Sequence, residues 1–312
     1  MNKQIPGPIV IFGAGGFIGF NLFLDLMGTR SDVFAISHDP KKNWRLKKIN
    51  IGSNRIIKCD LTKKKEIRDL IIKYKPKTIF NLAAYGAYST QNDPELIYKT
   101  NFVSSVNILE ILKNNQFSIY IQAGSQSEYG LNCTRPDEDA PYLPNSHYAV
   151  SKLAGFYLLK YYASIHKLPV VHVRPYSIYG PYEEPSRLIP TLLRNCKIGT
   201  LPDFVDPHIS RDFVYVTDMI DALKLIAVKS GKKSYGQAFN IASGKKTTIM
   251  ELAQLAKKIF KVDKQPVFGA MRNRAWDLSD WVGNPKKIYD IYGWQAKTNL
   301  AAGLKKTYNF IS

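Results

Sequence analysis

The sequence predicts an α/β protein in which a doubly wound parallel sheet carries a smaller C-terminal lobe. Two observations predict this fold class. Short apolar runs of strand character alternate with segments of helical periodicity from residue 9 to about residue 175. These runs are apolar on both faces, which is typical of a parallel sheet covered by helices on both sides. A ligand of such a sheet is expected beyond the carboxyl ends of its strands.

The first predicted strand, residues 9–12, leads directly into a glycine-rich turn and then into an apolar helical pattern. The turn contains Gly13, Gly16 and Gly19. Glycine allows a tight turn and lets a pyrophosphate approach the N-terminus of the helix, where free N–H groups and the helix dipole hold it. The strand before the glycines and the helix after them are the context that supports this interpretation. We expect a Rossmann-type dinucleotide site; the alternative is a glycine-rich turn that holds no ligand.

The remaining elements follow in order along the chain. Strands are expected at residues 33–36, 55–59, 78–82, 119–121 and 170–173. Helices are expected over the apolar positions of residues 67–74, which Pro76 ends, over residues 94–114, and around Tyr148 as far as residue 166. Beyond about residue 175 the pattern becomes irregular and rich in proline. We expect residues 1–175 to form the dinucleotide-binding domain and residues 176–312 mainly a substrate-binding lobe, with about residues 212–242 returning to the first domain.

Composition narrows the classes of partner. Hydrophobic residues make up 45% of the 312 residues, as in an ordinary globular protein, and no apolar run approaches the roughly 20 residues that span a membrane. The net charge of +19 is scattered, without a platform that interleaves basic and aromatic residues. We expect no membrane span and no nucleic acid partner, although the charge can attract a phosphate-bearing ligand. Three cysteines without metal-ligand spacing suit a reduced, cytoplasmic protein with no metal site: Cys59, Cys133 and Cys196.

Tyr148 and Lys152 lie one helical turn apart, so their side chains are expected to face the same way. A free phenol titrates near pH ~10, and an ammonium one turn away favours the phenolate. A tyrosine prepared in this way can pass a proton to or from a sugar or alcohol oxygen. The spacing also occurs by chance, and on its own it more often describes a solvated helix face.

The chain resembles the extended short-chain dehydrogenase/reductase family, whose members are nucleotide-sugar epimerases, dehydratases and reductases. The glycine turn and the pair Tyr148 and Lys152 match this family, and further matches follow in family order over nearly the whole chain. These matches are Asp60-Leu61, Asn81 to Ala84, Asn101, Ser125 to Gly130, Arg174-Pro175, Ile178 to Pro181, Arg211 to Val216 and Asn284 to Lys287. The resemblance implies a Rossmann fold, a nicotinamide cofactor and a nucleotide-sugar substrate.

The resemblance assigns roles to individual residues. Tyr148 matches the catalytic acid/base, Lys152 the residue that lowers its pKa and binds the nicotinamide ribose, and Ser125 the hydroxyl that bonds the reacting sugar oxygen. The resemblance places the cofactor pyrophosphate at Gly13, Gly16, Phe17, Ile18 and Gly19, adenine beside Asp60 and Leu61, and nicotinamide beside Ala83, Ala84 and Pro175.

The end of the second strand bears on the choice of cofactor. Members that use NAD carry an acid there for the adenosine ribose, whereas this chain has Ser37 followed by His38. A serine can donate to a 2′-phosphate that an acid would repel. Three basic residues follow and can neutralise such a phosphate: Lys41, Lys42 and Arg45. NADP is therefore favoured over NAD; Asp39 is the counter-evidence, because a small shift of alignment would make it the ribose acid.

Substrate contacts are expected mainly in the second lobe. The resemblance places the sugar diphosphate on Arg211 and Arg274, and a guanidinium can bind two of its oxygens together. The run around Arg274 departs from the family pattern, so a surface charge is the alternative there. Further substrate contacts are implied for Ser125, Gln126, Ser177 and Arg187.

The residues after Ser125 bear on the reaction type. Family 4,6-dehydratases carry an Asp-Glu pair there, whereas this chain has Gln126 and Ser127. Glu128 lies one residue late, and in an extended segment its side chain should point elsewhere, unless a local turn redirects it. The Cys/His pair of GDP-fucose-type epimerase-reductases is not at that family's motif positions. Dehydration is therefore disfavoured, which leaves hydride transfer at one carbon.

Residues 124–130 are similar to reductases that finish CDP- or dTDP-deoxysugars, such as the abequose and paratose synthases. The sequence thus favours an NADPH-dependent reductase of a nucleotide-linked 4-keto-6-deoxysugar. The alternatives are an NAD-dependent nucleotide-sugar 4-epimerase and, from another class, a non-enzymatic member of the fold. A homodimer is expected through the helices at residues 94–114 and around Tyr148, by analogy with the fold.

Overall fold

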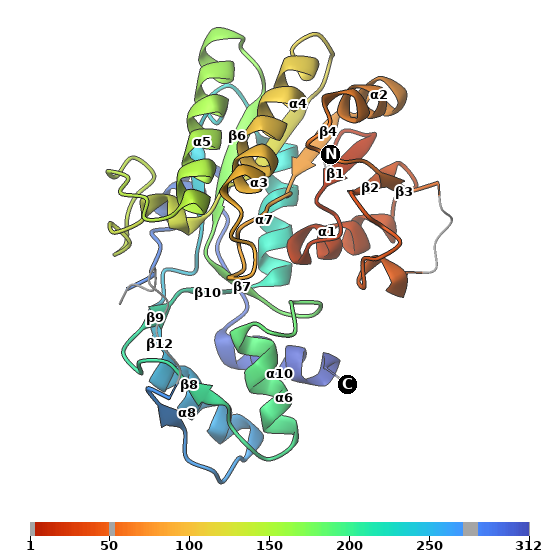
Figure 1. Cartoon of the computed structure of the whole chain (residues 1–312). Coiled ribbons are helices and arrows are strands. Elements are labelled where there is room, and N and C mark those ends of the chain that lie inside the picture. The colour runs from red at the N-terminus through yellow and green to blue at the C-terminus, as the bar shows by residue number, and fades with distance from the viewer. Residues whose placement is uncertain (1–3, 50–53, 271–279, 312) are drawn as a thin grey trace.

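A computed structural model describes residues 4–49, 54–270 and 280–311. Within these residues, seven parallel strands form one sheet in the order β11-β6-β5-β4-β1-β2-β3 (Figure 1). The strands are β1 (Ile9–Phe12), β2 (Val33–Ser37), β3 (Ile56–Lys58), β4 (Thr78–Asn81), β5 (Ile119–Ala123), β6 (Val170–Pro175) and β11 (Ala238–Ile241). The strand order reverses between β1 and β4, and the sheet confirms the predicted doubly wound α/β fold.

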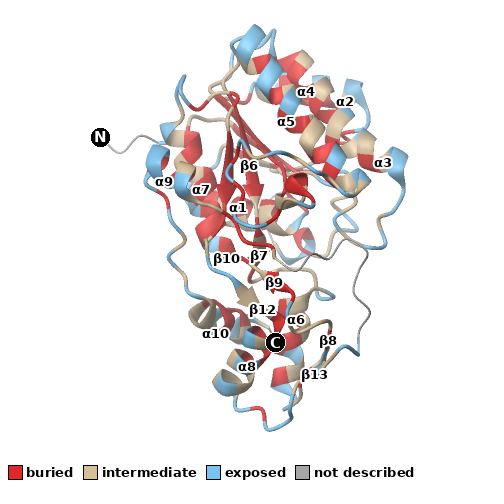
Figure 2. Ribbon diagram, turned by 90° about the vertical axis from the view of Figure 1, so that its left-hand side faces the viewer, coloured by how far each residue is buried: buried red, intermediate tan, exposed pale blue. Residues whose placement is uncertain are grey.

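Helices cover both faces of the sheet. On one face lie α1 (Phe17–Met27), α7 (Val216–Lys229) and α9 (Lys286–Tyr292), and on the other lie α2 (Lys64–Tyr74), α4 (Ser104–Leu112) and α5 (His147–Ile165). Successive residues of β1 alternate between the two cores: Ile9 and Ile11 pack with the first set of helices, Val10 and Phe12 with the second. Figure 2 shows the sheet as a buried layer. Burial on both faces explains why every residue of β1 is apolar.

The helix predicted at residues 94–114 contains a π-helical turn. This turn, Lys99–Val103, separates α3 (Pro94–Tyr98) from α4. Asp93 caps α3, because its carboxylate accepts the N–H of Leu96 at 3.2 Å. The apolar pattern did not reveal the π turn, and such turns are frequent at functional sites.

The chain enters the second lobe directly from the carboxyl end of β6. The lobe contains β7 (Ser177–Tyr179), α6 (Leu188–Lys197), β8 (Asp203–Phe204), β9 (Ser210–Arg211), β10 (Phe213–Tyr215), β12 (Thr247–Thr248), α8 (Ile249–Phe260), β13 (Val267–Phe268) and α10 (Leu300–Phe310). Helices α6, α8 and α10 share a separate hydrophobic core. Short strands and prolines interrupt this part of the chain, so the apolar periodicity did not predict these helices. Among the described residues, no helix has both the length and the apolar character needed to cross a bilayer.

Between β10 and β12 the chain returns to the sheet. Helix α7 packs on α1, and β11 pairs in parallel with β6, with Ala238 opposite His172. Figure 1 shows α7 beside the sheet and α6, α8 and α10 below it. The carboxyl ends of the central strands therefore face the second lobe.

Candidate active site

The glycine turn after β1 closes tightly against the loop that follows β4. Gly13 has a φ of +75°, and a Cβ there would lie 2.5 Å from the backbone nitrogen of Ala83. A Cβ at Gly19 would lie 2.4 Å from the carbonyl oxygen of Gly13, so both positions exclude a side chain. Helix α1, which begins with Phe17 and Ile18, has no side-chain cap in its first turn. Its N-terminal N–H groups are therefore available to an anion such as a pyrophosphate.

Ser125, Tyr148 and Lys152 lie together beyond the carboxyl ends of β4 and β5. The ammonium of Lys152 lies 5.8 Å from the centre of the Tyr148 ring. It donates to the carbonyl of Ala123 at 2.9 Å and to that of Ala83 at 3.4 Å, so it bridges two strand ends. The hydroxyl of Ser125 lies close enough to Tyr148 to lower the pKa of its phenol. The structure thus brings the three predicted catalytic residues together.

The ionisation of Tyr148 differs from the expectation. Burial raises the pKa of Tyr148 to about 12, although the nearby hydroxyl of Ser125 lowers it. Burial also lowers the pKa of Lys152 to about 8. The prediction that Lys152 holds the pKa of Tyr148 below its usual value was wrong, because desolvation of the phenolate dominates and the ammonium points to backbone carbonyls.

The segment after Ser125 is a 3-10 turn, Gln126–Tyr129, and not the extended segment that the sequence suggested. The Ser125 hydroxyl accepts the N–H of Ser127 at 3.1 Å, and the Glu128 carboxylate accepts the N–H of Ser125 at 2.9 Å. This capping box turns Glu128 inward, so the local turn that the sequence left open, and not the alternation of an extended segment, describes Glu128. Gln126 and Ser127 remain next to Ser125, and the side-chain oxygen of Gln126 is buried without a partner among the described residues.

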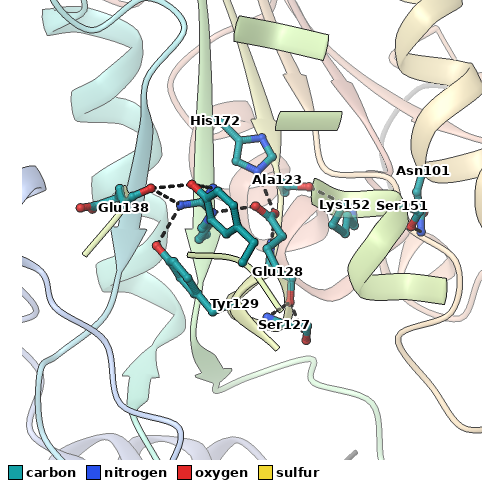
Figure 3. Close-up of polar contacts among 12 residues, drawn as sticks. Asn101, Ala123, Ser127, Glu128, Tyr129, Glu138, Ser151, Lys152 and His172 are labelled. Atoms are coloured by element: carbon teal, nitrogen blue, oxygen red, sulfur yellow. Dashed lines mark hydrogen bonds and ion pairs between the residues drawn. The ribbon is translucent and has the colours of Figure 1, made fainter. Parts of the chain in front are cut away.

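Glu128 is fully buried and held by two residues of β6 (Figure 3). Arg174 donates to its Oε2 at 2.6 Å, and Nε2 of His172 lies 2.8 Å from its Oε1. Burial opposes ionisation of Glu128, but His172 and Arg174 outweigh it and hold the pKa of the carboxyl at about 2. A carboxylate that stays ionised and paired at neutral pH does not exchange a proton with a substrate.

Asn101, in the π turn, fixes the loop after β4 that carries Ala83 and Ala84. Its Oδ1 accepts the N–H of Tyr85 at 2.9 Å, and its Nδ2 donates to the Tyr85 carbonyl at 2.8 Å and to the Ser151 hydroxyl at 2.9 Å. The amide thus ties the loop to α5. The two alanines that were expected beside nicotinamide lie on the segment held in this way.

The residues expected around adenosine lie at the ends of β2 and β3, next to the glycine turn. Ser37 is buried, and a Cβ at Gly15 would lie 3.2 Å from its hydroxyl oxygen. His38 follows it and is exposed. Asp60 and Leu61 follow β3, with Leu61 buried. These four residues therefore share one end of the site.

Arg45 has a different position from the one expected. Its side chain is buried, donates to the carbonyl of Tyr182 at 2.7 Å, and lies 3.2 Å from the carboxylate of Glu184. The suggestion that Arg45 neutralises a 2′-phosphate is not supported, because its guanidinium joins the loop after β2 to the loop after β7. Lys41 and Lys42 remain exposed on the same loop.

Arg187 lies close to the reaction centre. Its charge lowers the pKa of Tyr148, and its guanidinium lies 5.6 Å from the centre of the Tyr88 ring. Its Nε is 3.9 Å from a carboxylate oxygen of Glu183. Tyr88 carries no sequence signal of its own, and only the fold brings it under Arg187.

The other residues expected to bind substrate are more dispersed. Pro175 ends β6 and Ser177 begins β7, both partly buried at the junction of the sheet with the second lobe. Arg211 lies in β9 and donates to the carbonyl of Ser210 at 2.8 Å. Arg274 lies outside the described residues. Over residues 4–49, 54–270 and 280–311 there is no cluster of His, Cys, Asp and Glu that could hold a metal ion.

Asp212 organises three segments of the second lobe, a role that the sequence did not reveal. One carboxylate oxygen accepts the N–H of Ser243 at 2.8 Å and its hydroxyl at 2.6 Å. The other accepts the N–H groups of Gly244 at 2.9 Å and Gly283 at 3.1 Å. Its place within the matched motif around Arg211 was the available signal.

The fold is that of a doubly wound α/β protein, and Ser125, Tyr148 and Lys152 lie together at the carboxyl ends of its strands. A family model described as the NAD dependent epimerase/dehydratase family matches residues 9–242. The chain therefore belongs to this family, whose members are NAD(P)-dependent nucleotide-sugar enzymes, as the resemblance predicted. Relatives of the chain include epimerases, dehydratases and reductases of nucleotide sugars.

Three relatives illustrate the similarity. The UDP-glucose 4-epimerase of Mycolicibacterium smegmatis is 28% identical over 96% of this chain and 97% of its own length. The structure of a UDP-glucose 4-epimerase of Thermotoga maritima with UDP-glucose has a TM-score of 0.86 at 24% identity, covering 97% of each chain. A UDP-glucuronic acid 4-epimerase of Bacillus cereus, in complex with UDP-glucuronic acid and NAD, has a TM-score of 0.85 at 23% identity, covering 97% of this chain and 98% of its own. At these identities the two structures establish the fold alone.

Proposed function

We propose that this protein uses NADPH to reduce the ketone of a nucleotide-linked 4-keto-6-deoxysugar. One observation carries the proposal: Ser125, Tyr148 and Lys152 are assembled without a second proton-exchanging acid beside Ser125 among the residues that the structure describes. Gln126 takes the position of the dehydratase acid, and Glu128 is paired with buried partners. Elimination of water needs such an acid, whereas hydride transfer to one carbon does not.

The ionisation of the centre suits a reduction. In the proposed reaction Ser125 holds the ketone oxygen, Tyr148 gives it a proton, and Lys152 stabilises the phenolate that forms. A nicotinamide cofactor supplies the hydride when it is bound. With a pKa of about 12, Tyr148 is protonated at neutral pH, which is the state that a proton donor needs at the start of the reaction.

The chain fits a nicotinamide dinucleotide. Side chains are excluded at Gly13 and Gly19, which leaves a cradle at the start of α1 for a pyrophosphate. For NADP over NAD, the support is Ser37 in place of an acid, together with exposed Lys41 and Lys42. Asp39 accepts the backbone N–H of Lys42 at 3.2 Å, within its own loop.

Cofactor choice is tested by the double variant Lys41→Ala/Lys42→Ala, with Arg45→Met as the matched control. The double variant should weaken NADPH binding about tenfold and leave NADH binding nearly unchanged, as nicotinamide fluorescence would measure. Arg45→Met should change both affinities alike. A wild-type protein that binds NADH much more tightly than NADPH would overturn the NADP assignment.

For the substrate, we propose that the second lobe holds the nucleotide diphosphate. Arg187 lies near Tyr148 and can contact the sugar or the diphosphate. Arg211 and Arg274 keep the role that the resemblance implies, on the diphosphate. Ser177 and Gln126 are proposed to contact the sugar or the nucleotide.

The reaction is tested by incubating the purified protein with NADPH and either CDP- or dTDP-4-keto-6-deoxyglucose. The expected result is a substrate-dependent fall of absorbance at 340 nm, with one NADPH consumed per ketone. Tyr148→Phe should abolish the fall. Stable absorbance with both substrates, under conditions where NADPH binding is saturated, would refute the proposal.

The second candidate is an NAD-dependent nucleotide-sugar 4-epimerase. It is favoured by the UDP-glucose 4-epimerases among the relatives, one of which is 28% identical over nearly the whole chain. This activity predicts interconversion of UDP-glucose and UDP-galactose with no net change in nicotinamide absorbance. Chromatography of the nucleotide sugars after incubation without added NADPH separates it from a reductase.

We also propose that the protein forms a homodimer through α5 and the helices α3 and α4. Apolar residues are exposed on α5 and in the π turn between α3 and α4: Val103 (42%), Val150 (39%), Tyr161 (49%) and Ile165 (63%). Light scattering on the eluted protein should give twice the mass of one chain. Val150→Glu combined with Ile165→Glu should give a monomer, and a monomeric wild type would refute this arrangement.

A further inference from the structure

The buried cluster behind Ser125 is more elaborate than a packing role requires. Glu128 comes from the 3-10 turn, and His172 and Arg174 come from the neighbouring strand β6. All three side chains are fully buried. A buried charged cluster of this kind is weak evidence for stability alone, because desolvation offsets much of its attraction. Its location beside the reaction centre is the more informative feature (Figure 3).

Glu128 holds the backbone of Ser125 directly. Its Oε1 accepts the N–H of Ser125 at 2.9 Å, while Arg174 fixes its Oε2 at 2.6 Å. The residue before Ser125 must be glycine for this approach: a Cβ at Gly124 would lie 2.0 Å from Oε1 of Glu128 and 2.1 Å from Nε2 of His172. The position of the Ser125 hydroxyl therefore depends on the carboxylate of Glu128, which residues of strand β6 hold in place.

Glu128 also supplies the negative charge that acts on Lys152. Burial lowers the pKa of Lys152, and Glu128 is the charged neighbour that raises it. Among the described residues, the titratable groups facing Lys152 are Tyr148 on its own helix, Glu128 from the 3-10 turn and His172 from β6. The ends of β4 and β5 contribute backbone carbonyls.

His172 is the second partner of this carboxylate. Burial lowers the pKa of His172 and outweighs the opposing effect of Glu128. Nε2 of His172 faces Oε1 of Glu128, and Nδ1 has no hydrogen-bond partner among the described residues. Arg174 is the cation that pairs with Glu128, and Glu128 is the charged neighbour that opposes the effect of burial on Lys152.

We propose that Glu128 is a positioning residue of the reaction: clamped by Arg174 and His172, it fixes the backbone of Ser125, two residues from the Ala123 carbonyl that holds Lys152, and places its negative charge near that ammonium. This inference rests on the proposed role of the serine, tyrosine and lysine centre. It does not depend on which nucleotide sugar is reduced. Cofactor affinity can therefore test this role, because its measurement needs no substrate.

The test uses Glu128→Gln in the full-length protein and follows the affinity for NADPH and NADH by fluorescence from pH 6 to pH 10. Loss of the charge should move the alkaline loss of affinity down by about one pH unit, because Lys152 then deprotonates more easily. The matched control is Glu138→Gln. Glu138 is also a buried carboxylate near Arg174, but it accepts the N–H of Asn240 at 2.8 Å and contacts neither Ser125 nor Lys152.

The proposal is overturned if cofactor affinity is lost at the same alkaline pH in Glu128→Gln as in the wild type. It is also overturned if the pH of this loss shifts equally in Glu138→Gln. If Glu128→Gln fails to fold, Glu128→Gln/Arg174→Met takes its place, because it removes both charges of the pair and leaves no unpaired guanidinium. A smaller shift in the same direction is expected there, because loss of the Arg174 charge partly offsets loss of the Glu128 charge. With substrate, Glu128→Gln should lower kcat at least tenfold with a smaller change in KM. A shifted alkaline loss of affinity in a protein that turns over no ketosugar would refute the proposed reduction and leave the role of Glu128 standing.

Discussion

Replacing Tyr148 by phenylalanine removes one hydroxyl and keeps the ring that packs beside Lys152. The cofactor-facing geometry of Lys152 should survive, because its ammonium donates to the carbonyls of Ala123 and Ala83 and not to the phenol. Loss of a general acid lowers turnover by roughly 10²–10⁴-fold, which corresponds to about 3–5 kcal/mol of transition-state stabilisation. The free energy of unfolding should change by at most about 1 kcal/mol, since the ring stays in place and only one hydroxyl near Ser125 is lost.

The assay measures kcat by absorbance at 340 nm and the cofactor dissociation constant by fluorescence, on the same preparation. Tyr157→Phe is the matched control, because Tyr157 lies on the same helix, about two and a half turns further on, and is 52% exposed. We expect Tyr157→Phe to behave as the wild type. A Tyr148→Phe protein that retains kcat within threefold of the wild type would refute the reasoning. So would a loss of cofactor affinity as large as the loss of turnover.

Three further predictions concern the cradle, the second lobe and acid stability. Gly19→Ala should weaken cofactor binding at least tenfold in a folded protein, because its Cβ would lie 2.4 Å from the Gly13 carbonyl; fluorescence titration measures this. Asp212→Asn should lower the free energy of unfolding by about 2–4 kcal/mol in urea, since an amide accepts on one oxygen only. The pKa of Glu128 is lowered from 4.5 to about 2, so Glu128 should contribute about 3 kcal/mol to the free energy of unfolding above pH 5. This contribution should be lost as the pH falls toward 2. In urea unfolding, Glu128→Gln/Arg174→Met should lack this pH dependence.

Each of these predictions has a contradicting outcome. Wild-type cofactor affinity in Gly19→Ala would mean that the turn opens without cost. An Asp212→Asn protein as stable as the wild type would mean that the three segments are held by their own packing. If the free energy of unfolding falls as steeply with decreasing pH in the double variant as in the wild type, other carboxylates cause the acid dependence.

The sheet and its glycine turn were predictable because their signals are local and periodic. Strand β1 is apolar at every position because both its faces are buried, and Gly13 and Gly19 are glycines because backbone atoms occupy the space of a side chain. These constraints act within a few residues, and the sequence records them directly. The pairing of Ser125, Tyr148 and Lys152 followed from the resemblance, which carries the long-range information that periodicity lacks.

What could not be predicted depends on contacts between segments far apart in the chain. Arg45 is a basic residue on the cofactor side, but its partners are Tyr182 and Glu184, more than 130 residues later. The 3-10 turn directs Glu128 inward, where Arg174 of β6 pairs with it. Arg174 lies 46 residues later in the chain, so no local sequence pattern connects the two. In both cases the sequence shows a charged residue near the site, but it does not show which distant residue pairs with it.

The pKa of Tyr148 shows the same limit in electrostatic form. The spacing of Tyr148 and Lys152 predicts that the ammonium assists the phenolate, but it contains no information about desolvation. Burial raises the pKa of the phenol to about 12 and lowers that of the ammonium to about 8. Near neutral pH the centre therefore holds a protonated phenol beside a lysine that is close to losing its charge. Such a centre donates a proton more readily than it accepts one, and the negative charge of Glu128 is what extends the pH range over which Lys152 can stabilise the phenolate left behind.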